Sequence, residues 1–260
     1  MKFFDSHAHL DDEKFNEDRE ELIEEIRKSD IDKFISAGYS LEGSKKGIEL
    51  AGKYDFIYTT SGISPNDIPQ TEEELWKNLK EIEKMAQENK RVVAIGEIGL
   101  DYYWEKEEKM RKLQKIAFIE QIKIANKIDL PIVIHTREAV MDTIQILKEN
   151  NVKNKGIFHC CPLNRELVKE ALKLGFYISF AGPITFKNSK NANEIIEIVP
   201  NDKILIETDS PYLAPEPVRG TRNNPINVKY IAQKIADVKK LSLEEVAKMT
   251  YENAEKIFKI

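Results

Sequence analysis

Pro131-Ile132-Val133-Ile134-His135 is a short apolar run that ends on a histidine. A strand that is apolar at every position is buried on both faces, which is typical of a parallel sheet covered by helices. Other runs, most of them apolar throughout, predict strands near Phe3–Asp5, Lys33–Ala37, Phe56–Ser61, Val92–Ile95, Gly156–Phe158, Phe176–Phe180 and Ile204–Ile206. Strands of this type predict an α/β protein built on a parallel sheet.

The segments between these runs have the residue spacing of amphipathic helices. Two sets of apolar residues each share one helix face: Phe15, Leu22, Ile23 and Ile26, then Leu75, Leu79, Ile82 and Ala86. Thr71–Glu74 and Ser242–Glu245 predict capping boxes that start helices. The alternation predicts a single (β/α)8 TIM barrel domain over residues 1–260, with extra C-terminal helices. The alternative, an open doubly wound sheet, needs a glycine-rich nucleotide loop near its first strand, and the sequence has none there.

The composition is that of a globular protein with a charged surface. Hydrophobic residues make up 41% and charged residues 33% of the chain, and its net charge is −5. Without a basic tail, the chain does not fit a protein that coats nucleic acid non-specifically, although a local basic cleft is compatible with this charge. No apolar run approaches the roughly 18 residues of a membrane span, and the N-terminus lacks the apolar region of a signal peptide. We therefore expect a cytoplasmic protein without membrane contact, and a monomer.

Potential metal ligands gather at the ends of the strand-like runs. All four histidines lie at such ends, and two carboxylates occupy similar positions. In a parallel barrel, functional side chains gather where the carboxyl ends of the strands meet. Imidazole and carboxylate groups together suit a divalent metal. We therefore predict a metal centre formed by His7, His9, Glu97, His135, His159 and Asp209.

These side chains also have ordinary structural interpretations, and for His135 it is that of a buried structural histidine. His7 and His9 are two residues apart, so on a strand both rings point to one side and could chelate a cation, or they could be half-buried polar residues. Glu97 lies between glycines, a setting that favours a bridging carboxylate over a surface ion pair. Asp209 could bind metal and take a proton from water, or it could cap the turn that follows. Asp5 could orient an imidazole or be a solvated strand-end residue.

Two arginines and two cysteines lie next to the predicted ligands. Arg219 and Arg222 follow the last strand-like run, where their guanidinium groups could bind a substrate phosphate or pin a loop through ion pairs. Cys160 follows His159 directly, and strand alternation points its thiol away from that histidine. We therefore interpret Cys160 and Cys161 as packing residues rather than metal ligands.

These motifs resemble the TatD family of metal-dependent deoxyribonucleases, within the amidohydrolase-like barrels. The resemblance covers nearly the whole chain and lies in Phe4–Leu10, Gly96–Tyr103, Pro131–Glu138, Tyr177–Asn188, Ile206–Pro215 and Arg219-Gly220. It implies a metal-dependent hydrolase that cleaves phosphodiester bonds of DNA, from a 3′ end or in a single strand.

The resemblance also assigns the ligands to a pair of divalent ions, for which Mg, Mn, Zn, Fe or Ni are all compatible. The first ion takes His7, His9 and Asp209, the second takes His135 and His159, and Glu97 bridges them. The ions would polarise the phosphoryl oxygen and lower the pKa of a water. Asp209 and Glu97 would be the catalytic carboxylates, and Arg219 or Arg222 would hold a flanking phosphate.

Two loops depart from the family pattern. The family's Gly-x-His-Pro-His segment is here Gly62–Asn66, in which Ser64 and Asn66 replace both histidines. The aromatic-Ser-Gly that usually follows the histidine of the sixth strand is here Cys160-Cys161-Pro162. Because these loops face the substrate, the departures bear on substrate preference and turnover.

Two other functions fit the same ligands. The first is a carbonyl-directed hydrolase that acts on an amide, a lactone or a D-aminoacyl-tRNA ester. Many such barrels bridge their metals with a modified lysine, so Glu97 favours phosphoester chemistry instead. The second is a metal-binding scaffold without catalysis, against which the complete ligand set argues.

Overall fold

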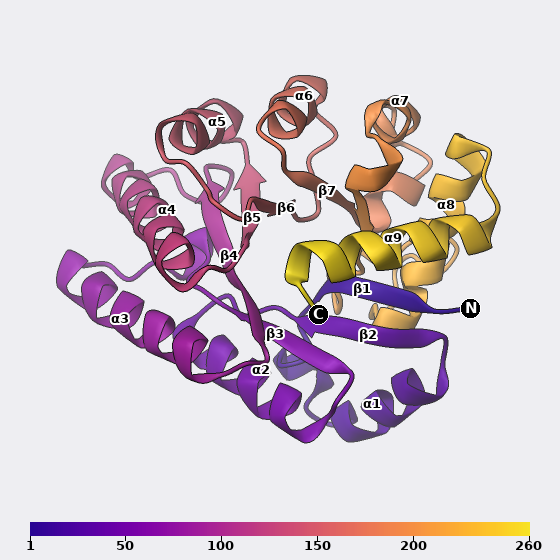
Figure 1. Cartoon of the computed structure of the whole chain (residues 1–260), viewed down its shortest axis with the longest axis horizontal. Helices are drawn as coiled ribbons and strands as arrows, with labels where there is room; N and C mark the ends of the chain where they lie inside the picture. Colours follow the sequence, from indigo (N-terminus) through magenta and orange to yellow (C-terminus); the bar gives the residue numbers. More distant parts are fainter.

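Parallel strands form one sheet that curls into a nearly closed barrel (Figure 1) in the computed structural model, which describes residues 1–260. Each strand pairs with its neighbour in chain order. The strands are β1 Phe3–Ala8, β2 Ile31–Ser36, β3 Ile57–Ser61, β4 Val92–Asp101, β5 Ile132–Arg137, β6 Gly156–Phe158, β7 Tyr177–Phe180 and β8 Ile204–Ile206. The predicted (β/α)8 TIM barrel is therefore confirmed.

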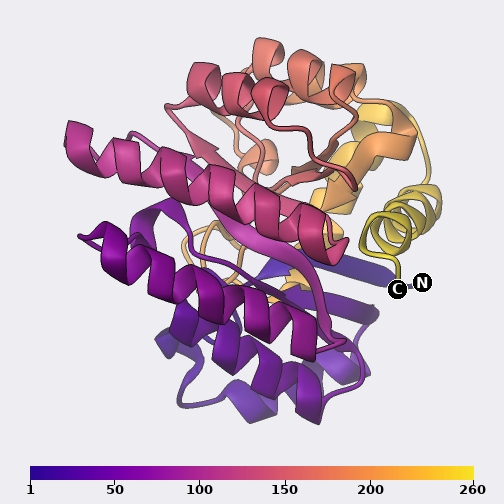
Figure 2. The same cartoon turned by 60° about the vertical axis from the view of Figure 1, so that its left-hand side comes forward.

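Helices surround the strands on the outside, as Figures 1 and 2 show from two directions. The helices are α1 Arg19–Lys28, α2 Leu41–Lys53, α3 Glu72–Glu88, α4 Glu108–Ile128, α5 Val140–Glu149, α6 Arg165–Lys173, α7 Ala192–Ile198, α8 Val228–Lys239 and α9 Leu243–Phe258. None of them combines the length and the apolar character that crossing a bilayer requires. The prediction of extra helices at the C-terminus is confirmed by α9, which follows the helix of the last β/α unit.

Helix α9 closes the amino-terminal end of the barrel. Its residues Ala254, Ile257 and Phe258 pack in one buried cluster with Phe4 and Val93, which lie at the starts of β1 and β4. A separate and larger buried cluster fills the space between the strands and the outer helices. With its amino-terminal end closed by α9, the barrel is open at the carboxyl ends of its strands, where functional sites of this fold lie.

The sequence predicts two capping boxes, and the structure forms only one of them completely. Ser242 makes the full reciprocal box with Glu245 at the start of α9. Thr71 accepts a hydrogen bond from the Glu74 amide at 3.3 Å, without the reciprocal bond. The prediction that Phe15 shares the face of α1 is wrong, because Phe15 lies in a separate 3-10 turn, Glu13–Phe15, where it is still buried.

Strand β4 runs further than its apolar stretch predicted. It continues from Val92 through Glu97 to Asp101, and its register against β5 shifts between Ile95 and Ile98. Beyond the shift, Gly99 pairs with His135 and Asp101 with Arg137. The glycines permit this shift, because a side chain at Gly99 (φ 139°) would collide with the backbone of β5. Glu97 therefore lies inside a strand rather than in the loop after it.

Side chains help to close the seam between β8 and β1. The buried Asp5 carboxylate accepts hydrogen bonds from the Thr208 amide at 2.9 Å and the Thr208 hydroxyl at 2.5 Å. Ser6 donates to the Ile206 carbonyl at 3.0 Å, and the Asp209 amide donates to the His7 carbonyl at 2.9 Å. This seam fixes the end of β1 against the segment after β8, which brings His7 close to Asp209.

Candidate metal centre

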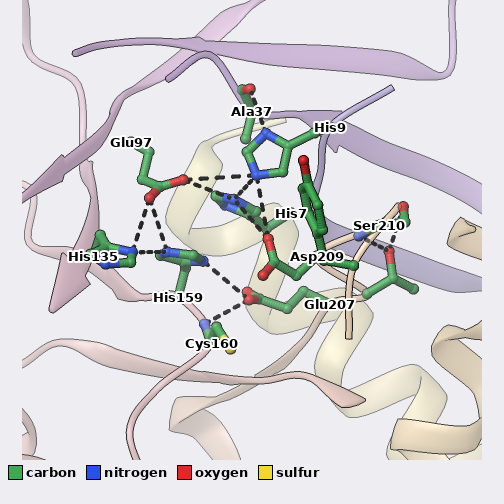
Figure 3. A network of polar contacts seen from close by, with 12 residues as sticks. His7, His9, Ala37, Glu97, His135, His159, Cys160, Glu207, Asp209 and Ser210 are labelled. Carbon is green, nitrogen blue, oxygen red and sulfur yellow. Dashed lines mark hydrogen bonds and ion pairs between the residues drawn. The ribbon is translucent and has the colours of Figure 1, made fainter. Parts of the chain in front are cut away.

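The six predicted ligands meet at the carboxyl-terminal end of the barrel (Figure 3). They come from β1 and the residue after it (His7, His9), β4 (Glu97), β5 (His135), the residue after β6 (His159) and the segment after β8 (Asp209). Their imidazole and carboxylate atoms form overlapping groups in which all potential ligand atoms lie within 4.8 Å of one another. The structure thus brings together every side chain that the sequence proposed for the centre.

His7 and His9 form the first pair of imidazoles. Their Nε2 atoms lie 3.2 Å apart, as expected for two residues that point to the same side of a strand. The Oδ1 atom of Asp209 lies 3.6 Å from His7 Nε2 and 3.3 Å from His9 Nε2. Asp209 has a left-handed backbone (φ 55°), which turns its side chain toward the two rings. These three side chains offer two nitrogens and one oxygen to a single position.

His135 and His159 form the second pair. His135 Nδ1 lies 3.2 Å from His159 Nε2, so these rings also turn one nitrogen each toward a common position. The ring of His159 stacks on that of His7 with 4.1 Å between the ring centroids. The two pairs are therefore adjacent parts of one cluster.

Glu97 lies between the two histidine pairs (Figure 3). Its Oε2 atom is 3.4 Å from His7 Nε2 and 3.8 Å from His9 Nε2. Its Oε1 atom is 3.0 Å from His135 Nδ1 and 3.4 Å from His159 Nε2. Each carboxylate oxygen thus faces one pair, which is the arrangement that a carboxylate needs in order to bridge two cations.

The outward nitrogens of three of these rings face other groups. His135 Nε2 lies 3.0 Å from Asp101 Oδ2, and His9 Nδ1 lies 3.2 Å from the Ala37 carbonyl oxygen. His159 Nδ1 lies 3.3 Å from Glu207 Oε1, which also accepts a 2.6 Å hydrogen bond from the Cys160 amide. The hydrogen-bond partners of His135 and His9 fix the tautomer that leaves the inward nitrogen free to bind a metal, whereas His159 Nδ1 faces Glu207 without a hydrogen bond.

The charges of the cluster keep both carboxylates ionised. Burial would raise the pKa of Glu97, but the positive charge of His159 and hydrogen bonds from His135, His159 and His7 hold it well below its usual value. The pKa of Asp209 is likewise lowered by its hydrogen bond to His9 and by the charges of the neighbouring rings, against the effect of burial. Conversely, burial lowers the pKa of His9, but the carboxylate of Asp209 raises it to about 9.

These observations fit a bound metal. Buried carboxylates beside converging imidazoles require positive charge, which a divalent ion supplies without protonating the rings. The donor set is nitrogen and oxygen, without sulfur. Burial raises the pKa of the Cys160 thiol well above its usual value, which disfavours the thiolate form that binds metals. Residues of this chain could therefore hold ions at both histidine pairs.

A pocket of about 770 Å³ opens over the cluster. His9, Glu97, His135, His159 and Asp209 contribute to its floor, and its walls include Trp104, Arg137, Pro162, Leu163, Ile184, Tyr212 and Leu213. Cys160 and Cys161 also line it. The alternation argument for Cys160 is wrong, because β6 ends at Phe158 and Cys160 has a left-handed backbone (φ 36°).

Arg219 and Arg222 do not line this pocket. Arg222 forms an ion pair with Asp18 and donates to the Lys14 carbonyl at 2.7 Å. The Arg219 guanidinium lies 4.1 Å from the ring centroid of Phe186. Their contact with a substrate phosphate stays a prediction, and in this structure the arginine at the pocket wall is Arg137.

The two loops that depart from the family pattern lie at the same end of the barrel. Asn66 lines the pocket, and its Nδ2 atom is 3.5 Å from Asp101 Oδ2. Ser64 is turned to its own loop, where it donates to Asp67 at 2.7 Å. Asn66 thus presents an amide to the pocket at a position where the family carries an imidazole.

Comparison with known proteins places the chain in a family. The model of the family described as TatD related DNase matches residues 4–259. The chain is 44% identical over 260 residues to YabD of Bacillus subtilis (strain 168), described as an uncharacterized metal-dependent hydrolase, with 99% of each chain covered. It is 36% identical over 264 residues to YcfH of Escherichia coli (strain K12), of the same description, covering 100% of this chain and 97% of YcfH.

A solved structure shows the same fold. The crystal structure of YJJV, described as a TatD homolog from Escherichia coli K12, superposes with a TM-score of 0.91 at 24% identity, covering 99% of this chain and 98% of that one. The full-length matches to the family model and to both sequence relatives agree with a donor set suited to divalent cations. The chain therefore belongs to the TatD family and is a metal-dependent hydrolase.

Proposed function

We propose that this chain hydrolyses phosphodiester bonds of DNA with two divalent ions held at the two histidine pairs. One ion would take His7, His9 and Asp209, the other would take His135 and His159, and Glu97 would bridge them. The observation that carries the proposal is the position of Glu97, whose two oxygens face different histidine pairs. Bound there, such ions would lower the pKa of a water and offset charge on the phosphoryl oxygens of a diester.

Side chains of the protein would have separate roles in this reaction. Asp209 is ionised and lies at the pocket floor, where it can accept a hydrogen bond from the attacking water and then its proton. Glu97 holds the two histidine pairs in register, so that both face the same substrate group. The Asp101 and Ala37 contacts keep the rings of His135 and His9 oriented while substrate enters and leaves.

The pocket also bears on the carbonyl-directed alternative. No lysine lines it, so the position between the histidine pairs is filled by Glu97 and not by a modified lysine. Paired cations can hold both the attacking and the leaving oxygen of a phosphodiester. This supports DNA, rather than an amide or a lactone, as the substrate.

A substrate comparison tests the proposal. Protein loaded in turn with Mg²⁺, Mn²⁺, Zn²⁺, Fe²⁺ or Ni²⁺ is assayed on an end-labelled single-stranded oligonucleotide, a lactone and a D-aminoacyl ester. Glu97→Ala protein purified in the same way is the control for contaminating nucleases. We expect metal-dependent loss of nucleotides from the DNA that the control lacks. Equal nuclease activity in the control, or efficient turnover of the ester or lactone with intact DNA, contradicts the proposal.

A further inference from the structure

An exposed aromatic wall stands beside the candidate metal centre. Trp104 is 66% exposed and Tyr103 is 39% exposed, although both are large apolar side chains. Their rings meet edge to face with 4.7 Å between the centroids, and Trp104 lines the pocket over the histidine cluster. Together with Arg137 they are called the aromatic shelf here. Exposed aromatic rings at the mouth of a pocket offer a face on which a flat group can stack.

The cation of the shelf has no acidic partner. The Arg137 guanidinium lies 3.8 Å from the ring centroid of Tyr103 and 5.6 Å from that of Trp104, and it forms no ion pair. The neighbouring Lys106 differs, because it pairs with Glu138 at 3.7 Å and donates to the Tyr102 carbonyl. A guanidinium that is stacked on a ring and free at its edge keeps its donors available for an oxyanion.

The shelf is fixed to the metal centre through one buried carboxylate. Asp101 Oδ1 accepts hydrogen bonds from the Tyr103 amide at 2.9 Å and the Trp104 amide at 3.0 Å. Asp101 Oδ2 contacts His135 Nε2 at 3.0 Å. The turn that carries both aromatic rings and the ring of a candidate ligand therefore share one support. A substrate group on the shelf is held at a constant position relative to the reacting centre.

We propose that the aromatic shelf binds an unpaired nucleotide next to the bond that is cut, with its base stacked on Trp104 and a phosphate on Arg137. This inference rests on the proposed function and adds to it the residues that would hold the strand beside the cut bond. A base inside a duplex is covered on both faces by its neighbours and can lie on an exposed indole only after it has left the duplex, whereas the guanidinium can hold a phosphate of either form. The pairing of a free aromatic face with a free guanidinium favours a nucleic acid strand, which presents a base and a phosphate at each step.

Tryptophan fluorescence tests the stacking directly. The chain has two tryptophans, Trp76 and Trp104, so Trp76→Phe leaves Trp104 as the sole indole. Trp76 lies on α3, outside the pocket. Metal-loaded Trp76→Phe protein is titrated with a phosphorothioate-linked oligothymidylate, then with a long duplex in which few base pairs lie at an end. We expect saturable quenching by the single strand and much weaker quenching by the duplex. Unchanged fluorescence with the single strand, or equal quenching by the single strand and the duplex, contradicts binding of an unpaired base to the aromatic shelf.

Kinetics supply a second readout. Trp104→Ala should lower kcat/KM on single-stranded DNA about tenfold, as expected for the loss of one stacked base, with most of the loss in KM. Trp104→Phe should restore most of it, and Trp76→Ala is the matched control that leaves cleavage unchanged. Arg137→Ala should reduce the slope of log affinity against log salt by about 0.7, the contribution of one phosphate contact on a single strand. Unchanged KM in Trp104→Ala together with an unchanged salt slope in Arg137→Ala contradicts the inference.

The two proposals fail separately. If wild-type protein cleaves DNA while Trp104 gives no fluorescence response, the shelf is wrong and the proposed function stands. If the oligothymidylate quenches Trp104 but no diester is hydrolysed with any metal, the shelf binds a strand and the proposed function is wrong.

Discussion

Replacing Asp101 with Asn tests how the candidate ligand His135 is oriented. Asp101 is fully buried, and its carboxylate faces His135 Nε2 at 3.0 Å and the amides of Tyr103 and Trp104. Burial would raise the pKa of Asp101, but the His135 hydrogen bond lowers it, so the group is an ionised acceptor. The acceptor holds the proton of His135 on Nε2 and leaves Nδ1 free toward Glu97 and a cation.

The expected loss of metal affinity depends on which hydrogen bonds remain in Asp101→Asn. The side-chain oxygen that remains could still accept from the two backbone amides, because these bonds use one carboxylate oxygen. The new side-chain amide group would then face His135 Nε2 as a donor, which favours the tautomer with the proton on the inward nitrogen. The loss is therefore one charge-assisted hydrogen bond, about 1.5–3 kcal/mol. This corresponds to a roughly 10- to 100-fold weaker affinity for the ion at His135 and His159.

The assay is a competition titration of Mn²⁺ or Zn²⁺ against a chromophoric chelator. Asp101→Asn should weaken one class of site and leave the other within about twofold, because His7, His9 and Asp209 do not contact Asp101. Asp142→Asn is the matched control, since Asp142 also holds a tyrosine of the same segment, Tyr102, at 2.6 Å, but does not touch the cluster. Unchanged affinity in Asp101→Asn, or equal weakening of both sites, would refute this reasoning.

Other predictions follow from the centre and from the opposite end of the barrel. Asp209→Asn should still bind DNA and at least one metal, but its turnover should fall by roughly 10²–10⁴ if Asp209 accepts the proton of the attacking water, as single-turnover kinetics would show. Phe258→Ala should lower the free energy of unfolding by about 3–5 kcal/mol in urea denaturation, since this buried ring closes the barrel. Burial would raise the pKa of Asp32, but hydrogen bonds from Lys2 and Tyr251 lower it. Asp32 therefore stabilises the fold above its unfolded-state pKa, and this stabilisation is lost as the pH falls through its folded-state pKa. Wild-type protein should therefore lose more stability between about pH 5 and 3 than Asp32→Asn in thermal denaturation, and identical pH profiles would contradict this.

Much of the centre follows from one regularity in the sequence. Strands buried on both faces are apolar throughout, so a polar residue at the end of such a run is conspicuous. His135 and His159 were found in this way, and a parallel barrel brings the ends of all strands to one rim. Their roles as ligands stay a prediction, whereas their convergence is a property of the structure.

The groups behind the candidate ligand rings are not recognisable from local sequence, because their contacts link residues of different strands. Asp101 reaches His135 only because β4 shifts register before it pairs with β5, and no local pattern announces the shift. Alternation along a longer last strand would put Glu207 on the same face as Asp209. In the structure β8 ends at Ile206, and Glu207 turns to His159 instead.

The ion pairing of the arginines could not be predicted from the sequence either. Arg222 follows the last strand at a position that suits a phosphate, yet it pairs with Asp18, 204 residues earlier in the chain. Arg137 lies two residues after His135, but nothing in its local sequence shows that it has no acidic partner. Ion pairing of long side chains depends on tertiary contacts, so sequence pattern alone does not separate a free guanidinium from an engaged one.

Metal content tests the central claim, which is that Glu97 joins two cation positions. Wild-type, His135→Ala and Glu97→Ala proteins are loaded with the same metal, desalted and measured by inductively coupled plasma mass spectrometry. We expect about two ions per chain in wild type, about one in His135→Ala, and a loss at both positions in Glu97→Ala. A Glu97→Ala protein that keeps its full metal content, while His135→Ala loses both ions equally, would contradict the account.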